Sequence, residues 1–377
     1  MTRRELLTSL AAAPLLTRVA RSASTPTATV AIGKCQSYDA AEVLATMSAM
    51  CDRIGGLPRL VANKTVTVKV NLTGASSDRI GGLAPGRTHY THPQTVMALC
   101  HLLDRAGARR IRIVEGAFAS SGPLEDFLLD SGWNLRALAA AAKNLEFENT
   151  NVLGKGRQYH RVKVPGGGLI FPAWDLNHSY VETDVFVSMA KLKNHATCGV
   201  TLSMKNCFGI TPASIYGDDA GVDGPNENPA AGRGSSCHAG SRGPSKSAPQ
   251  ELDASSPRDP GFRMPRITAE LAAARPIHLA FIDGVETVAG GEGPWIGPKV
   301  RPVKPGVMLL GTNAVSTDTV ATAVMGYNPR AHRGSAPFRD CDNTLLLAES
   351  LGVGTADLNR IEVAGVPIAR ARFPFEA

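Results

Sequence analysis

Residues 184–195 read DVFVSMAKLKNH, a run of apolar and β-branched side chains that ends in two lysines and a histidine. A run of this kind predicts a strand over 184–192 that is buried on both faces, as strands of parallel sheets are. In open α/β sheets, ligands bind beyond the carboxyl ends of the strands. The stretch therefore predicts both a sheet and a site at its edge.

Strand and helix patterns alternate on either side of this stretch. The expected strands are 28–34, 65–72, 109–116, 145–150, 277–285, 305–313 and 360–366, and the expected helices are 39–54, 92–107, 123–142, 314–326 and 343–351. Strands separated by helix-length segments predict an α/β fold, with a mostly parallel sheet and helices on both faces. Residues 157–183 predict a small β-hairpin insertion, with Gly166, Gly167 and Gly168 at its turn.

A long loop interrupts the alternation at residues 217–262, which are dominated by Gly, Pro, Ser, Ala, Asn and Asp. Such a segment buries too little apolar surface to offset the entropy lost on ordering, so a long surface loop is expected. A loop of this length is functional or disordered, which leaves a flexible lid or an inert insertion. Residues 29–377 are otherwise expected to form a single α/β domain.

The first residues carry an export pattern. Arg3 and Arg4 precede a short apolar run, and Arg18 and several small residues follow it, as in a twin-arginine signal peptide. An amphipathic first helix is the alternative. We expect a leader at 1–28, recognition by the twin-arginine translocase, and a periplasmic or extracellular protein. The apolar run is too short for a stable anchor, and no membrane span is expected in the mature chain.

Composition narrows the class of partner. The chain is 43% hydrophobic and 19% charged, as in an ordinary soluble globular protein. Its formal charge is +7, of which residues 1–21 carry a net +3, leaving about +4. This mild excess favours anionic ligands over nucleic acid, which also requires aromatic side chains between the basic ones. The seven cysteines include no Cys-x-x-Cys pair, which argues against an iron–sulfur cluster and favours packing roles.

Polar side chains follow the expected strands and form a candidate anion site. They are Lys69, Asn71, Glu115, Lys191, Lys193, His195, Lys205 and Asn206. Lys191 and Lys193 share one face of an extended segment, which would aim both ammonium groups at one anion. The alternatives are a solvated basic face and, for Lys69, an ion pair. His195, Lys191 and Lys205 are the candidate catalytic groups, because a histidine or a lysine of lowered pKa can transfer a proton.

Asp283, Glu292 and Asp318 are candidate ligands for a divalent metal, because hard cations prefer oxygen ligands. For Asp318, stabilisation of a helix N-terminus is the alternative. His195 and Cys198 lack the further ligands of a zinc site. No GxGxxG, P-loop or Gly-x-Ser-x-Gly motif stands at a strand–helix junction, which disfavours dinucleotide or nucleoside-triphosphate binding and serine hydrolysis.

Together these motifs resemble a bacterial and archaeal family known as domain of unknown function 362. The resemblance covers roughly residues 30–366 and rests on KVNL at 69–72, HP at 92–93, KLKNH at 191–195, TLSMKNCFG at 201–209, IDGV at 282–285 and GEGP at 291–294. The family often has proline where this chain has Val70. Many relatives carry an appended ferredoxin-type cysteine cluster that is absent here, so an iron–sulfur role is not carried over.

The family supplies no settled reaction, and the residues themselves leave the chemistry open. We expect an exported enzyme, or former enzyme, that binds a small carboxylate or phosphate through a lysine cluster, with or without a divalent metal. The alternative is a non-catalytic periplasmic binding or redox-accessory protein with the same cluster used for recognition.

Overall fold

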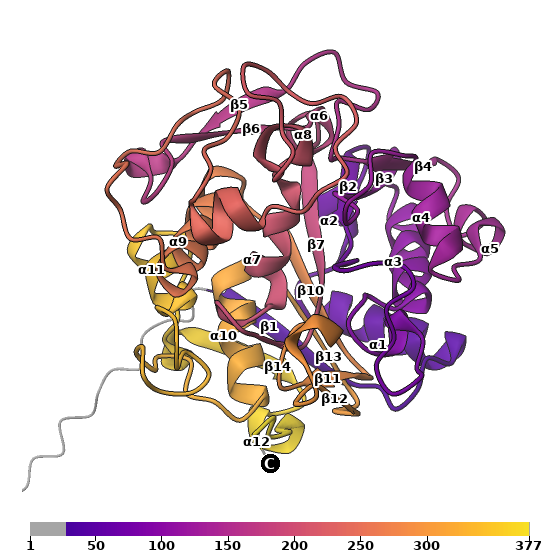
Figure 1. Ribbon diagram of the computed structural model, residues 1–377. Coiled ribbons are helices and arrows are strands. Elements are labelled where there is room, and N and C mark those ends of the chain that lie inside the picture. Colours follow the sequence, from indigo (N-terminus) through magenta and orange to yellow (C-terminus); the bar gives the residue numbers. More distant parts are fainter. Residues whose placement is uncertain (1–27, 377) are drawn as a thin grey trace, which may run out of the picture.

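The computed structural model describes residues 28–376, and the expected leader lies outside them except for its last residue. Within this range the centre of the molecule is an eight-stranded sheet (Figure 1). In spatial order its strands are β14 (Ile361–Gly365), β1 (Ala28–Lys34), β13 (Val307–Gly311), β10 (Leu279–Gly284), β7 (Val185–Lys191), β2 (Thr65–Lys69), β3 (Arg110–Glu115) and β4 (Leu145–Asn149).

The sheet is mixed, and one strand is responsible. β13 runs antiparallel to both of its neighbours, β1 and β10, whereas the other neighbouring pairs are parallel. The carboxyl ends of β2, β3, β7 and β10 therefore meet at one edge of the sheet, and the carboxyl end of β13 lies at the opposite edge. The prediction of a mostly parallel sheet is confirmed.

Each face of the sheet is covered by helices that pack on their own hydrophobic core. Along β10, Leu279 and Phe281 join one core and Ala280 and Ile282 join the other, because successive side chains of a strand point to opposite faces. The first face carries α1 (Ala40–Arg53), α3 (Pro93–Arg105), α4 (Leu124–Asp130) and α5 (Leu135–Ala139). The second carries α7 (Leu202–Asn206), α9 (Pro260–Ala274), α10 (Ala314–Val324) and α11 (Thr344–Ser350).

Local sequence explains where these helices begin and end. His92 caps α3 by accepting the Gln94 amide on Nδ1, and Pro93 occupies the first helical position, where its missing N–H costs nothing. The expected helix over 123–142 is broken into α4 and α5 at Gly132. Its φ of +81° is a backbone conformation that glycine adopts without steric cost. α9 was not expected from the sequence. Short helices complete this set: α2 (Pro58–Val61), α6 (His178–Val181), α8 (Ala213–Tyr216) and α12 (Ile368–Ala371).

Smaller β elements surround the sheet. The predicted hairpin insertion is present as β5 (His160–Lys163) paired antiparallel with β6 (Ala173–Leu176), and all three glycines of its turn have positive φ. Two further pairs are β8 (Asn194–His195) with β9 (Gly199–Val200), and β11 (Thr287–Ala289) with β12 (Arg301–Val303).

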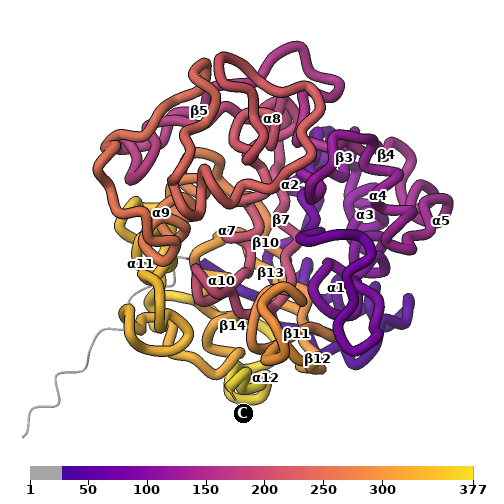
Figure 2. Tube along the Cα trace, viewed as in Figure 1, coloured from indigo at the N-terminus to yellow at the C-terminus, as the bar shows by residue number. Residues whose placement is uncertain are grey.

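The loop at 217–262 contains a single π-helical turn, Gly234–Ala239, before α9 begins at its end. Figure 2 shows the loop folded over the same end of the molecule as α8 and β5. Backbone hydrogen bonds join Ser245 to Ile215 in α8 and Leu252 to Ile170 in the hairpin insertion. The loop is thus built onto the domain as a wall rather than extended away from it.

Candidate functional site

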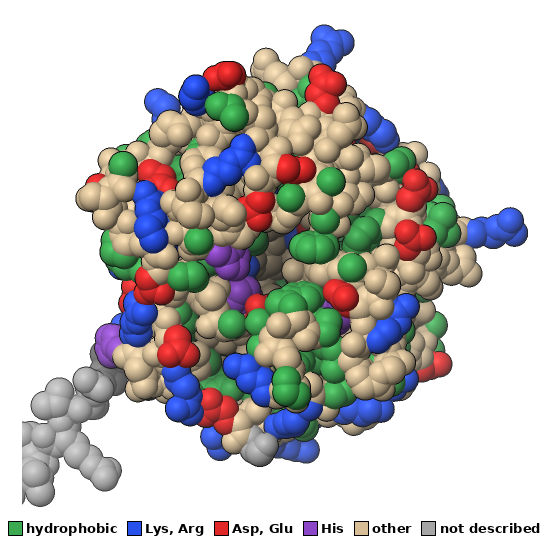
Figure 3. Space-filling view, viewed as in Figure 1, with side chains coloured by type: hydrophobic (Ala, Val, Ile, Leu, Met, Phe, Trp, Pro, Cys, Tyr) green, Lys and Arg blue, Asp and Glu red, His purple; other side chains and the backbone are tan. Residues whose placement is uncertain are grey.

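A cavity of about 680 Å³ opens beyond the carboxyl ends of β2, β3 and β7. Figure 3 shows it as a hollow in the middle of one face, with histidine side chains on one side and hydrophobic side chains around it. Eight of the residues singled out in the sequence line it: Lys69, Asn71, Glu115, Lys193, His195, Lys205, Asn206 and Glu292. Lys191, Asp283 and Asp318 do not.

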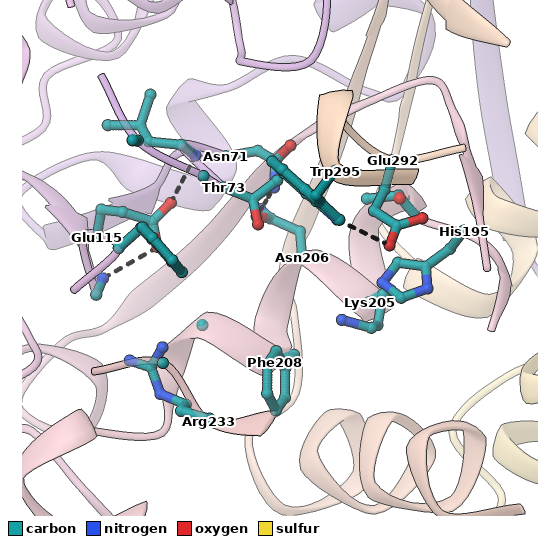
Figure 4. Close-up of a pocket in the computed structure, with 18 of the residues that line it drawn as sticks. Asn71, Thr73, Glu115, His195, Lys205, Asn206, Phe208, Arg233, Glu292 and Trp295 are labelled. Atoms are coloured by element: carbon teal, nitrogen blue, oxygen red, sulfur yellow. Dashed lines mark hydrogen bonds between the residues drawn. The ribbon is translucent and has the colours of Figure 1, made fainter. Parts of the chain in front are cut away.

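One wall of the cavity is a polar network around Lys69, to which Glu115 and Asn206 of Figure 4 belong. Lys69 Nζ lies 2.6 Å from Glu115 Oε1 and donates to Val70 O and to Asn206 Oδ1, both at 2.9 Å. Glu115 also accepts the backbone amides of Leu72 and Gly116. The three donors of the ammonium group are all used, so Lys69 holds this wall together and has no proton left for a ligand.

The two asparagines extend this network. Asn206 Oδ1 accepts Asn71 Nδ2 at 3.2 Å as well as the Lys69 ammonium group, and Asn206 Nδ2 donates to Ser188 Oγ at 3.0 Å. Asn206 belongs to α7, Asn71 follows β2 and Ser188 lies in β7, so the amides tie the helix to two strands. Their side chains face the cavity as part of a fixed floor.

Lys193 and Glu292 form the opposite wall of the cavity. The Lys193 ammonium group and the Glu292 carboxylate do not form an ion pair. Lys193 Nζ donates to two carbonyl oxygens, His89 O at 2.8 Å and Glu292 O at 3.0 Å. The Glu292 carboxylate accepts the Ala196 amide at 2.9 Å and Trp295 Nε1 at 3.3 Å. Burial, the largest cause, lowers the pKa of Lys193 well below its ordinary value.

His195 is a neutral hydrogen-bond donor. Burial first, and then the charges of Lys205, His238 and Lys193, lower its pKa well below 6.5. Its Nδ1 accepts the Thr197 amide at 3.1 Å, so the single ring proton of the neutral imidazole lies on Nε2. His195 therefore donates through Nε2 and has no free nitrogen lone pair with which to accept a proton.

Lys205 is the cation of the cavity that lacks a polar partner. Within residues 28–376, its ammonium group makes no hydrogen bond or ion pair, and Nζ lies over the Phe208 ring at 4.2 Å from the centroid. Burial lowers the pKa of Lys205 below its ordinary value of 10.5. In Figure 4, Lys205 lies beside His195 with Phe208 next to it.

The long loop contributes a second cation, Arg233. Its Nε donates to Thr211 O at 2.6 Å, its Nη2 bonds Asn151 Oδ1, and its guanidinium lies 5.9 Å from the Phe208 ring centroid. Among the described residues Nη1 makes no hydrogen bond, which leaves a donor for a ligand. His238, from the same loop, also lines the cavity, and burial together with Lys205 lowers its pKa to about 3.

Lys191 is built into the core and not into the cavity. Its Nζ lies 3.0 Å from Asp283 Oδ2 and also donates to Tyr38 Oη at 2.8 Å and Gly86 O at 2.9 Å, with both charged side chains fully buried. The two residues are partners in the register of β7 with β10. The structure thus does not place Lys191 and Lys193 on one ligand, as their spacing had suggested.

Asp318 stabilises a helix. It accepts the Ser203 amide at 2.9 Å, the Ser203 hydroxyl at 2.5 Å and the Met204 amide at 2.9 Å, at the start of α7. Asp283 is paired with Lys191 and Glu292 lies in the cavity wall, so the three acidic residues are not brought together. In the described part of the chain, no group of three or more His, Cys, Asp or Glu side chains is arranged to hold a metal ion.

Several residues of the cavity were not singled out in the sequence. Arg233 and His238 stand in the long loop among other charged residues such as Arg242 and Lys246, so no signal in the sequence singled them out. Trp295 follows the glycine-rich GGEGP segment, and Phe118 follows the end of β3. Phe208 stands within the KNCFG motif beside Lys205 and Asn206.

Comparisons with known proteins give one curated relative and one matching family model. The chain is 25% identical over 187 residues to a thylakoid-associated protein of Synechocystis sp., an alignment that covers 49% of this chain and 51% of that protein. The chain thus spans about half the length of this curated relative. No solved structure matches the chain, and no helix of the described residues is long and apolar enough to cross a bilayer. The family model described as "Domain of unknown function (DUF362)" matches residues 66–323, more than half of the sequence, and the chain belongs to that family.

Proposed function

We propose that the cavity binds a small carboxylate or phosphate and that Lys205 exchanges a proton with it. The observation that carries this proposal is the environment of Lys205, a buried amine at the cavity wall with no polar partner among the described residues. A buried charge without a partner is unfavourable. An anion in the cavity supplies the missing partner.

Two further donors suit the same anion. Arg233 offers Nη1, and His195 offers the proton on Nε2. Charge-assisted hydrogen bonds from lysine and arginine are the strong contacts of carboxylate and phosphate sites. A neutral histidine that donates can stabilise negative charge that develops on an oxygen atom. His195 is therefore assigned to oxyanion stabilisation and not to proton abstraction.

The lowered pKa gives Lys205 two states with different roles. As an ammonium group it binds the anion, and as a free amine it can accept a proton from the bound molecule. The hydrogen-bonded network around Lys69 keeps its wall of the cavity rigid, which holds a ligand in one orientation. We further propose, from the sequence of the leader, that the protein acts after export.

The first test is replacement of the unpartnered amine. We expect Lys205→Met to weaken benzoate binding by at least about tenfold, since a hydrogen bond to a charged group contributes about 1.5–3 kcal/mol. Isothermal titration calorimetry on the full chain measures this. Lys163→Met is the matched control, because Lys163 is an exposed lysine of β5 outside the cavity. Equal affinity in wild-type and Lys205→Met protein would contradict the proposal.

The pH dependence of benzoate binding provides a second readout of the same experiment. Benzoate is ionised above about pH 6, and His195 is neutral there because its pKa is well below 6.5. We expect affinity to fall as the pH rises and Lys205 loses its proton, and this loss should begin below pH 10.5, the ordinary pKa of lysine. A separate experiment, deuterium uptake from D2O into a panel of aliphatic carboxylates, distinguishes an enzyme from a non-catalytic binding protein. Uptake that depends on Lys205 supports an enzyme, and binding without uptake indicates a non-catalytic binding protein.

A further inference from the structure

The cavity is much larger than its anion-binding donors require. A carboxylate or phosphate group is satisfied by three donors, whereas pockets of about 300–1,000 Å³ are typical of sites for organic ligands with a substantial apolar part. The volume of about 680 Å³ falls in that range. The space beyond Lys205, His195 and Arg233 must therefore be matched to the rest of a larger molecule.

Two aromatic side chains occupy that space. Trp295 and Phe118 line the cavity and remain 48% and 47% exposed. They are two of the five large hydrophobic residues that are exposed in the described part of the chain. Exposed apolar side chains gathered at a cavity mark binding surfaces more often than isolated ones do.

Trp295 is exposed but held in place. Its Nε1 donates to Glu292 Oε1 at 3.3 Å, its ring meets His89 edge-on with centroids 6.0 Å apart, and it packs directly on Gly74, where a Cβ would collide with the indole. Gly74 has a φ of +93°, which favours glycine on its own account. The chain thus positions one face of a large ring at the cavity without covering it.

Phe118 lines the cavity from a different segment than Trp295. It follows β3, lies close to Gly232 of the long loop, and shares the cavity lining with Arg233. Its ring and that of Trp295 come from separate segments of the chain and line the same cavity. Aromatic rings prefer offset-stacked or edge-to-face contacts with other rings.

We propose that the ligand of this cavity is an organic anion that carries a flat ring, with the anionic group at Lys205, His195 and Arg233 and the ring against Trp295 and Phe118. This inference rests on the proposed function, because it assigns the substrate class of the same site. It excludes inorganic phosphate and short aliphatic acids as the preferred ligands.

The test compares matched pairs of probes on the full chain by isothermal titration calorimetry. Phenyl phosphate is paired with inorganic phosphate, and benzoate with acetate. We expect each ring-bearing probe to bind about tenfold more tightly than its partner, the size of one well-placed aromatic contact together with the burial of the ring. In Trp295→Ala and in Phe118→Ala the ratio of the two dissociation constants should fall towards one.

Two variants separate loss of the ring from other effects. Trp295→Phe keeps an aromatic face but loses the hydrogen bond to Glu292, and it should retain part of the ratio. Leu129→Ala removes another exposed hydrophobic residue, on α4 and outside the cavity, and should leave the ratio unchanged.

The fluorescence of Trp295 provides a direct test of whether the ring of the ligand binds there. The other two tryptophans, Trp133 and Trp174, are buried, so acrylamide quenching of fluorescence reports mainly on Trp295. Phenyl phosphate should protect it from quenching and phosphate should not. If phosphate binds as tightly as phenyl phosphate, the ring is not recognised and this inference fails while the proposed function stands. If neither probe of either pair binds, both fail. A ratio that survives both alanine variants would also overturn the inference.

Discussion

Lys191 and Lys193 are two residues apart, yet their ammonium groups have different surroundings. Lys191 is neutralised by Asp283 on the neighbouring strand, whereas Lys193 meets only carbonyl oxygens and lines the cavity. Alternation along a strand predicts that both side chains share a face. It does not predict that one of them finds a carboxylate across the sheet, because pairing depends on the register of β7 with β10.

The first prediction at the residue scale concerns that ion pair. Removing one partner of a buried pair leaves an uncompensated charge, which costs about 3–5 kcal/mol. We expect Lys191→Met to lower the free energy of unfolding by about this amount, measured by urea denaturation. Lys246→Met is the control, because the Lys246–Asp223 pair is largely exposed and such pairs contribute about 0–1 kcal/mol.

The double variant Lys191→Met with Asp283→Leu should recover part of the loss, because no charge then remains unpaired. A Lys191→Met protein of normal stability that no longer binds benzoate would contradict this assignment. It would return Lys191 to the ligand site.

At the scale of elements, strand ends predicted from the sequence located the cavity, and strand direction explains why the residue that follows β13 is not part of it. Lys69, Glu115 and Lys193 follow parallel strands and lie together. Asp318 follows β13, whose reversed direction places its carboxyl end at the other edge of the sheet. A strand pattern carries no sign of direction, because alternation and apolar content read the same either way. Direction is set by which neighbours the strand pairs with, and that pairing is a tertiary property.

The long loop shows a second limit of local sequence. Its composition predicted a surface loop, and its low apolar content does not reveal that Arg233 reaches Asn151 and Thr211. Those contacts join segments more than twenty residues apart in the chain. Asp218 accepts the amides of Gly234 and Ser235, which fixes the turn that carries Arg233 and His238.

The prediction at this scale is that a bound anion protects the loop from proteolysis. Cleavage at exposed Lys246 requires local opening, and a ligand that binds only the closed form slows it. At a benzoate concentration 100 times the dissociation constant, stabilisation of about 2.7 kcal/mol gives up to about 100-fold slower cleavage. Timed trypsin digestion with mass spectrometry measures it, and Lys205→Met with the same benzoate concentration is the control. Equal rates with and without benzoate in the wild type would show the loop to be an insertion unconnected with binding.

At the scale of the whole molecule, the α/β class and both helical layers were predicted, because alternating strand and helix patterns are local. All seven cysteines are buried thiols, so the described fold contains no disulfide that would require an oxidising compartment. Folding before export is compatible with this, and twin-arginine substrates cross the membrane in the folded state.

The last prediction concerns export of the protein through the twin-arginine pathway. Arg3→Lys with Arg4→Lys should retain the protein in the cytoplasm, because the pathway depends on the paired arginines. Cell fractionation with immunodetection measures the distribution, and Arg18→Lys serves as the control. An unchanged distribution in the double variant would refute the twin-arginine assignment.

The position of β1 also determines when the eight-stranded sheet can be completed during synthesis. β1 pairs with β13 on one side and with β14 on the other, so its two neighbours come from the far end of the described chain. During synthesis β1 emerges before the other strands of the sheet and stays without its partners until β13 and β14 have been made. Its unpaired edges are exposed throughout that interval, and exposed strand edges promote aggregation. A chaperone that shields β1 until its partner strands have been made is therefore expected to raise the yield of soluble protein.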